Sequence, residues 1–253
     1  MLNNGERKTN QVYWEAVSRL SIRNRLPSRL NVGVLNVTRL IKMHVRQGSR
    51  YIEIGCAPGK ILAWVASVLK VETFGLDYSG PGIAKCRVLF DALGLKANLY
   101  HDDFFNHHLQ PASFDAVTSF GFIEHFDNAR LVVQKHLDLV KPGGVALITV
   151  PNYGGLYGLL QRWCDASNLE LHNLEIMNSC ALTELVDSPD AVSVRAYPFG
   201  TISPWLINLD KRLPRSVAKL ISFSVNTIGL AQPLTVKALA PMLVLEVRKA
   251  PAT

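Results

Sequence analysis

Two carboxylates and a glycine turn lie at a spacing that suits the binding of a nucleoside. Glu53 precedes a turn in which Gly55 and Gly59 remove side chains, so the backbone there can approach a ligand closely. Asp77 ends the next apolar run, where its carboxylate can accept hydrogen bonds from both hydroxyls of an adenosine ribose. Either feature alone is weak evidence, but their joint placement predicts a nucleoside-binding site.

The glycine turn departs from the pattern that binds dinucleotides. That pattern is Gly-x-Gly-x-x-Gly, and its later two glycine positions correspond here to Ala57 and Lys60. The turn therefore lacks two of the glycines that let the backbone approach a pyrophosphate. A ligand with one nucleoside and a zwitterionic tail fits better. Glu53 can lie near the ammonium group of such a tail, directly or through water, while backbone groups of residues 55–59 meet the rest.

The elements that must position these residues are predicted by apolar runs that alternate with helical periodicity. Short, mostly β-branched or aromatic runs predict strands at 50–55, 73–77, 97–102, 114–119 and 145–150. Apolar residues at helical spacing predict helices at 59–70, 83–93 and 128–140, the last ended by the turn 141–144 with its proline and two glycines. Further along, a helix is expected at 157–164 and strands at 193–196 and 242–247.

Five segments between Tyr51 and Asn152 resemble, in order, the core of the class I S-adenosylmethionine-dependent methyltransferases. They are YIEIGCAPG (51–59), GLDYS (75–79), HDDF (101–104), FDAV with GFIEHF (114–117 and 121–126) and LVKPGG (139–144). One departure is Ala57, where the family often has glycine, and it adds a single methyl group.

The resemblance implies an α/β fold with a Rossmann-like, doubly wound, mostly parallel sheet and an antiparallel final strand at 242–247. Residues 1–45 are expected to form a helical N-terminal cap and residues 46–200 the cofactor-binding core. Residues 201–253 would supply a helical insertion, in a stretch at 203–241 that contains four prolines, and then the final core strand. The three parts together would make a single domain. A nicotinamide-dependent oxidoreductase would instead have a parallel final strand.

The resemblance also implies which residues hold S-adenosylmethionine and its product S-adenosylhomocysteine. Asp77 would bind the ribose. The methionine part would be held by Glu53 and by the turn residues Gly55, Cys56, Ala57 and Gly59.

The adenine end of the cofactor would be held by residues that follow later strands. By the same resemblance, Asp103 would accept from the adenine amino group, the Phe104 backbone would meet the ring edge, and Tyr78 would flank the ring. Phe120 and Gly121 would close over the cofactor.

One histidine follows the fourth strand, where an acceptor would approach. His125 is expected to act as a general base if the acceptor is a hydroxyl. The alternative is that Glu124 and His125 form the structural pair found there in many relatives. Tyr13, His172 and Tyr153 are further candidates for the acceptor pocket, and helix packing explains Tyr13 equally well.

The predicted activity is methyl transfer to a hydroxyl or nitrogen of a small molecule, such as a secondary metabolite or a sugar-like acceptor. GFIEHF differs from the Asn/Asp-Pro-Pro-aromatic sequence of enzymes that methylate exocyclic base amines. An RNA or nucleoside methyltransferase and a non-catalytic cofactor-binding regulatory subunit remain as alternatives.

The composition limits the kinds of partner that the protein is expected to bind. The net charge is +7, but the basic residues are spread thinly and lack interleaved aromatics, so no nucleic-acid partner is expected.

The four cysteines have no Cys-x-x-Cys spacing, which predicts neither a metal site nor disulfides and favours a cytoplasmic location. Residues 1–8 do not predict a signal peptide, and no apolar stretch is long enough to span a bilayer. The amphipathic segment 217–230 suits peripheral membrane contact, a lipophilic acceptor, or packing in a monomer or homodimer.

Overall fold

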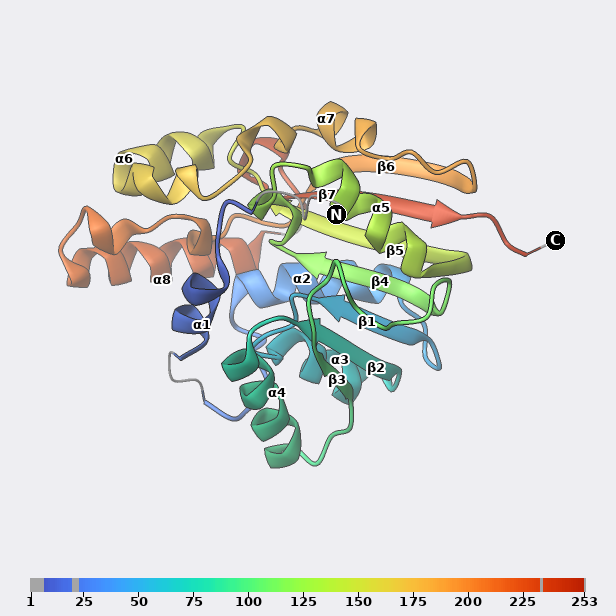
Figure 1. Cartoon of the computed structure of the whole chain (residues 1–253). Helices are drawn as coiled ribbons and strands as arrows, with labels where there is room; N and C mark the ends of the chain where they lie inside the picture. The colour runs from blue at the N-terminus through green and yellow to red at the C-terminus, as the bar shows by residue number, and fades with distance from the viewer. Residues whose placement is uncertain (1–6, 20–22, 233, 253) are drawn as a thin grey trace.

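A seven-stranded sheet forms the centre of the computed structural model, which describes residues 7–19, 23–232 and 234–252 (Figure 1). The strand order is β3-β2-β1-β4-β5-β7-β6. The strands are β1 (Arg50–Ile54), β2 (Glu72–Asp77), β3 (Asn98–His101), β4 (Phe114–Phe120), β5 (Val140–Pro151), β6 (Ala191–Phe199) and β7 (Met242–Lys249). Residues 1–6, part of the stretch for which no signal peptide is expected, lie outside the described residues.

The direction of the strands confirms the predicted fold class. Strands β1 to β5 pair in parallel, whereas β7 pairs with both β5 and β6 in the antiparallel sense. An antiparallel final strand is therefore present, and the parallel final strand of a nicotinamide-dependent oxidoreductase is not.

Helices cover both faces of the sheet because successive strand residues point to opposite sides. Ile52 and Ile54 pack on the face covered by α5 (Ala129–Leu139) and α7 (Ser179–Glu184). Tyr51 packs on the other face, which is covered by α2 (Val32–His44), α3 (Lys60–Leu69) and α4 (Gly80–Ala92). The three layers hold the carboxyl ends of the parallel strands at one edge.

Several elements extend beyond their predicted bounds. Strand β5 begins at Val140, and the expected turn 141–144 is a bulge within it, because β4 pairs through Phe114 with Val140 and then through Ala116 with Val145. Gly143 has φ 75°, and its N–H donates to the Ala250 carbonyl. Helix α6 (Leu156–Glu170) is longer than the predicted 157–164 and has a non-helical residue, Asp165.

The predicted helical insertion before the final strand is present. Between β6 and β7 lie the short 3-10 turns η3 (Pro204–Leu206), η4 (Leu209–Lys211) and η5 (Lys237–Leu239) and the helix α8 (Arg215–Ala231). The Asn226 side chain ties α8 to the start of α2, since it accepts from Val32 N–H and donates to the Leu30 carbonyl. No helix among the described residues is both long and apolar enough to cross a membrane.

Candidate functional site

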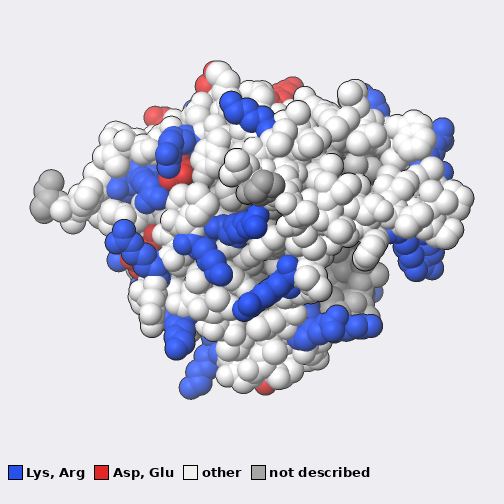
Figure 2. Space-filling model, turned by 180° about the vertical axis from the view of Figure 1, so that it is seen from behind, with Lys and Arg blue, Asp and Glu red and all other residues white. Residues whose placement is uncertain are grey.

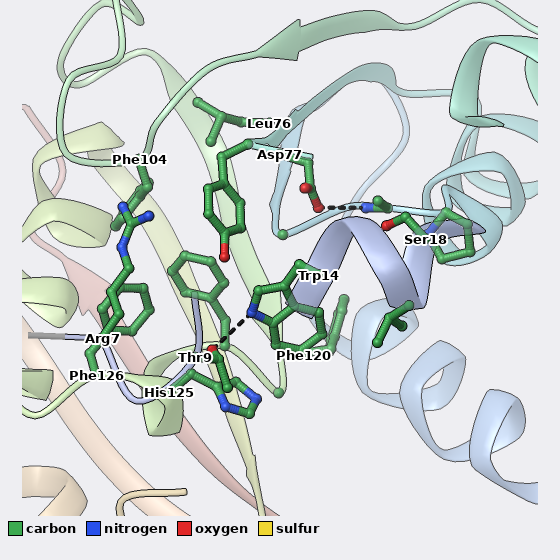
Figure 3. Close-up of a pocket in the computed structure, with 17 residues that line it drawn as sticks. Arg7, Thr9, Trp14, Ser18, Leu76, Asp77, Phe104, Phe120, His125 and Phe126 are labelled. Atoms are coloured by element: carbon green, nitrogen blue, oxygen red, sulfur yellow. Dashed lines mark hydrogen bonds between the residues drawn. The ribbon is translucent and has the colours of Figure 1, made fainter. Parts of the chain in front are cut away.

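A cavity of about 310 Å³ opens beyond the carboxyl ends of β1, β2 and β4, beneath α1 (Gln11–Arg19) (Figure 3). It brings together residues from the N-terminal segment, the glycine turn and the ends of three strands. Its lining consists of Arg7, Thr9, Trp14, Val17, Ser18, Gly55, Ala57, Pro58, Leu76, Asp77, Tyr78, Phe104, Phe120, Gly121, Phe122, His125 and Phe126.

The glycine turn and the end of β2 are joined by one carboxylate. Asp77 accepts from Ala57 N–H at 3.0 Å and from Ser79 N–H at 2.8 Å. The pairing of Ile54 with Leu76 brings the two strand ends level, so a single side chain can reach both segments. Burial raises the pKa of Asp77, and the two N–H donors and His101 oppose that rise.

Gly55 is required by the shape of the turn. Its φ is 70°, and an added Cβ would lie 2.8 Å from the Phe122 ring. Gly59, with φ 83°, is the N-cap residue of α3, where an added Cβ would lie 3.0 Å from Cys86 Sγ. The two glycines thus let the turn pass close to α4 and to Phe122 in the segment after β4.

Glu53 is a buried carboxylate with an unused oxygen. Its exposed fraction is 5%, and Oε2 has no hydrogen-bond partner among the described residues. Burial, then Cys86 and Asp77, raise its pKa well above the ordinary value. An unpaired buried carboxylate is costly, so this atom calls for a cationic or hydrogen-donating ligand.

Not all predicted site residues lie on the cavity wall. Cys56 is buried and lies against Cys86, whose hydrogen bond is the largest cause of the raised pKa of the Cys56 thiol. Tyr13 is 37% exposed on α1 and meets Trp14 edge-on, so Trp14 and not Tyr13 faces the cavity. Gly59 and Glu53 also lie off the wall.

An arginine that the sequence analysis missed occupies the predicted adenine end. Arg7 forms an ion pair with Asp103 at 2.6 Å and lies over the Tyr78 ring, 4.9 Å from its centroid. Asp103 also accepts from Phe105 N–H. Arg7 makes a β-bridge with Phe126, so this segment is held against the loop after β4. Asp103 therefore borders the site through Arg7.

Helix α1 covers one side of the cavity. The Trp14 indole N–H donates to Thr9 Oγ1 at 2.9 Å (Figure 3). The Ser18 and Ser79 hydroxyls are 3.1 Å apart. Gln11 donates to the Tyr78 carbonyl. Thr9, Gln11, Trp14 and Ser18 were also missed, because no motif marks them and the sequence indicated only a helical cap at 1–45.

His125 lines the cavity, and one of its ring nitrogens is engaged by the backbone. Its Nδ1 lies 2.9 Å from the Leu171 carbonyl, which can only accept, so Nδ1 carries the proton and Nε2 keeps its lone pair. Burial, and then His172, lower the pKa of His125 to about 4. The ring is therefore neutral at physiological pH. Its centroid lies 5.0 Å from that of the Trp14 ring, in an edge-to-face arrangement.

Glu124 and His172 complete a cluster around His125. The donor atoms of the three side chains lie within 4.8 Å of one another, and these are donor types that metal sites use. Burial raises the pKa of Glu124 to about 8. Tyr153 contacts the His172 ring, but its hydroxyl donates to the Leu206 carbonyl and is thus already engaged.

Comparisons with known proteins point to one family. The family model described as a methyltransferase domain matches residues 52–144. A probable S-adenosylmethionine-dependent methyltransferase of Mycolicibacterium smegmatis is 29% identical over 109 residues, which are 43% of this chain and 40% of that protein. A probable fatty acid methyltransferase of Pseudomonas putida is 25% identical over 194 residues, which are 70% of this chain and 48% of that protein.

A solved structure extends the likeness over nearly the whole chain. The S-adenosylmethionine-dependent methyltransferase from Archaeoglobus fulgidus superposes with a TM-score of 0.56 at 19% identity, covering 94% of this chain and 99% of that one. At that identity the likeness shows the fold. The chain spans less than half the length of the two curated relatives.

Replacing Arg7 tests whether it fastens the N-terminal segment. In Arg7→Ala we expect amide hydrogen exchange in residues 9–19 to quicken by about tenfold, because a partly buried charged hydrogen bond contributes roughly 1.5 kcal/mol. Lys8→Ala, which removes a more exposed ion pair with Asp127, is the matched control and should change exchange less. Equal exchange in wild type and Arg7→Ala would show that α1 is held by other contacts.

Proposed function

Because the chain belongs to the class I S-adenosylmethionine-dependent methyltransferases, we propose that it transfers a methyl group to a hydroxyl or nitrogen of a small-molecule acceptor. The observation that carries the proposal is a cavity whose lining includes both the buried carboxylate of Asp77 and the ring of His125. Such a cavity can receive a nucleoside cofactor at one end and an acceptor at the other.

The residues at the glycine turn fit S-adenosylmethionine. We assign the ribose to Asp77, whose buried carboxylate lies on the cavity wall, and the methionine ammonium to Glu53, whose Oε2 is unpaired. Backbone groups at Gly55 and Ala57 border the same wall. The cofactor supplies a methyl group already activated by its sulfonium, so the protein needs chiefly to align the acceptor and exclude water.

Apolar side chains provide that exclusion. The cavity wall includes the apolar rings of Trp14, Phe120, Phe122 and Phe126, and of these the Trp14 ring lies against His125. A wall of this kind favours an acceptor with an aromatic or aliphatic part. The relative from Pseudomonas putida, a probable fatty acid methyltransferase, supports a lipophilic acceptor here.

His125 is proposed to accept the proton of a hydroxyl acceptor. The Leu171 carbonyl fixes the ring orientation through Nδ1, which leaves Nε2 as the atom that can take a proton. Tyr13, the second candidate for this role, does not line the cavity. Tyr78 does line it, but lies at the end occupied by Arg7.

Glu53 gives a prediction about proton release. Its pKa is raised in the free protein, and a bound ammonium group would favour its ionised form, so S-adenosylhomocysteine binding at pH 7 should release a fraction of a proton. Affinity should accordingly rise with pH. Titration calorimetry in buffers of different ionisation enthalpy measures the release, and Glu53→Gln should abolish it. If Glu53→Gln releases the same fraction of a proton as wild type, Glu53 does not bind the ammonium group.

His125 gives a prediction about turnover. With methyl-labelled S-adenosylmethionine and a panel of hydroxyl acceptors, His125→Gln should lower kcat about 100-fold and leave the dissociation constant of S-adenosylhomocysteine unchanged. His172→Gln is the matched control and should retain most of the activity.

A chelator distinguishes a base from a metal ligand at the same position. Activity that survives the chelator in wild type and falls in His125→Gln supports the base. Activity that the chelator removes and zinc restores would instead assign Glu124, His125 and His172 to a metal site. Undiminished turnover in His125→Gln would show that Glu124 and His125 serve in packing and not in catalysis.

A further inference from the structure

Two helices at one end of the molecule leave large apolar side chains uncovered. On α8 only Ala218 and Gly229 are buried, whereas Phe223 is 70% exposed and Leu220 65%. On α6 Leu159 is 69% exposed and Trp163 52%. Soluble proteins rarely leave so many large apolar side chains together at the surface, so this end has the character of a contact surface.

The exposed residues form stripes along both helices. On α6 they recur at helical spacing, as do Val217, Leu220, Ile221 and Ile228 on α8. Both helices pack against η4, and they project side by side from the same end of the sheet (Figure 1). We call this the α6/α8 surface; it comprises Leu156, Leu159, Leu160, Trp163, Trp205, Val217, Leu220, Ile221, Phe223 and Ile228.

Basic side chains border the α6/α8 surface. On the α8 side, residues 209–231 contain Lys211, Arg212, Arg215 and Lys219, all exposed, against one acidic residue, Asp210. Helix α6 adds one arginine and two acidic residues, so the border as a whole stays basic. Arg212 also lies over the Trp163 ring, 5.6 Å from its centroid. Figure 2, the view from behind, shows this end on the right as mostly uncharged with basic groups at its margin.

We propose that the α6/α8 surface docks on an anionic lipid bilayer. Apolar helix faces flanked by arginine and lysine lie in the plane of such interfaces, and tryptophan favours the same depth. A second copy of the chain would place these basic borders against one another, whereas lipid phosphates complement them. Helix α1, which forms part of the cavity wall, lies at the same end of the molecule as α6 and α8 (Figure 1). Docking would therefore bring the cavity near the bilayer.

Flotation with vesicles tests the docking without cofactor or turnover, so its outcome is independent of the proposed methyl transfer. Wild type should float with vesicles of phosphatidylcholine and phosphatidylglycerol, and less with phosphatidylcholine alone. The double variant Leu220→Ser with Phe223→Ser should bind about tenfold more weakly. Arg212→Gln with Arg215→Gln should lose about tenfold on the anionic vesicles only.

The matched control is Val88→Ser with Val192→Ser, which removes apolar side chains that are 53% and 64% exposed on α4 and β6, elsewhere on the surface. It should float like wild type. Wild type that stays unbound with anionic vesicles overturns the proposal. Sedimentation showing a wild-type dimer that the Leu220→Ser, Phe223→Ser variant dissociates, without flotation, would assign the surface to a second copy.

Discussion

The buried carboxylate of Asp77 is the contact on which the site depends. Its two oxygens hold Ala57 N–H in the glycine turn and Ser79 N–H at the start of α4, so two crossover connections share one anchor. Burial disfavours the ionised form and the N–H donors favour it, which leaves a carboxylate held in place on the cavity wall. The strand pairing, the two glycines and the helices on both faces serve to keep this anchor in register.

The rest of the site comes from parts of the chain far from that anchor. Arg7 reaches Asp103, Trp14 faces His125, and His125 is oriented by the Leu171 carbonyl after α6. Segments before and after the core therefore close a cavity that the core alone would leave open. The same arrangement places α6 and α8 at the end where the cavity lies, so an acceptor drawn from a lipid phase would have a short path.

The core could be predicted from sequence because its signals are local. Alternating apolar runs located β1 to β5 within a few residues, and Gly55 and Asp77, which the sequence singled out, both lie on the cavity wall. The bulge in β5 was missed because proline and paired glycines usually end a strand, and only its pairing with β4 keeps it extended. Arg7 and Trp14 were missed for a different reason: their partners lie far along the chain, and no local pattern encodes such contacts.

Calorimetric titration with S-adenosylhomocysteine, with NAD as the competing ligand, tests the central claim most directly. Wild type should bind S-adenosylhomocysteine and not NAD, and Asp77→Ala should weaken that binding about 100-fold, since two hydrogen bonds to a charged group contribute roughly 3 kcal/mol. Thermal unfolding of the variant checks whether the fold persists. Binding of NAD, or binding of S-adenosylhomocysteine that Asp77→Ala leaves unchanged, would contradict the account.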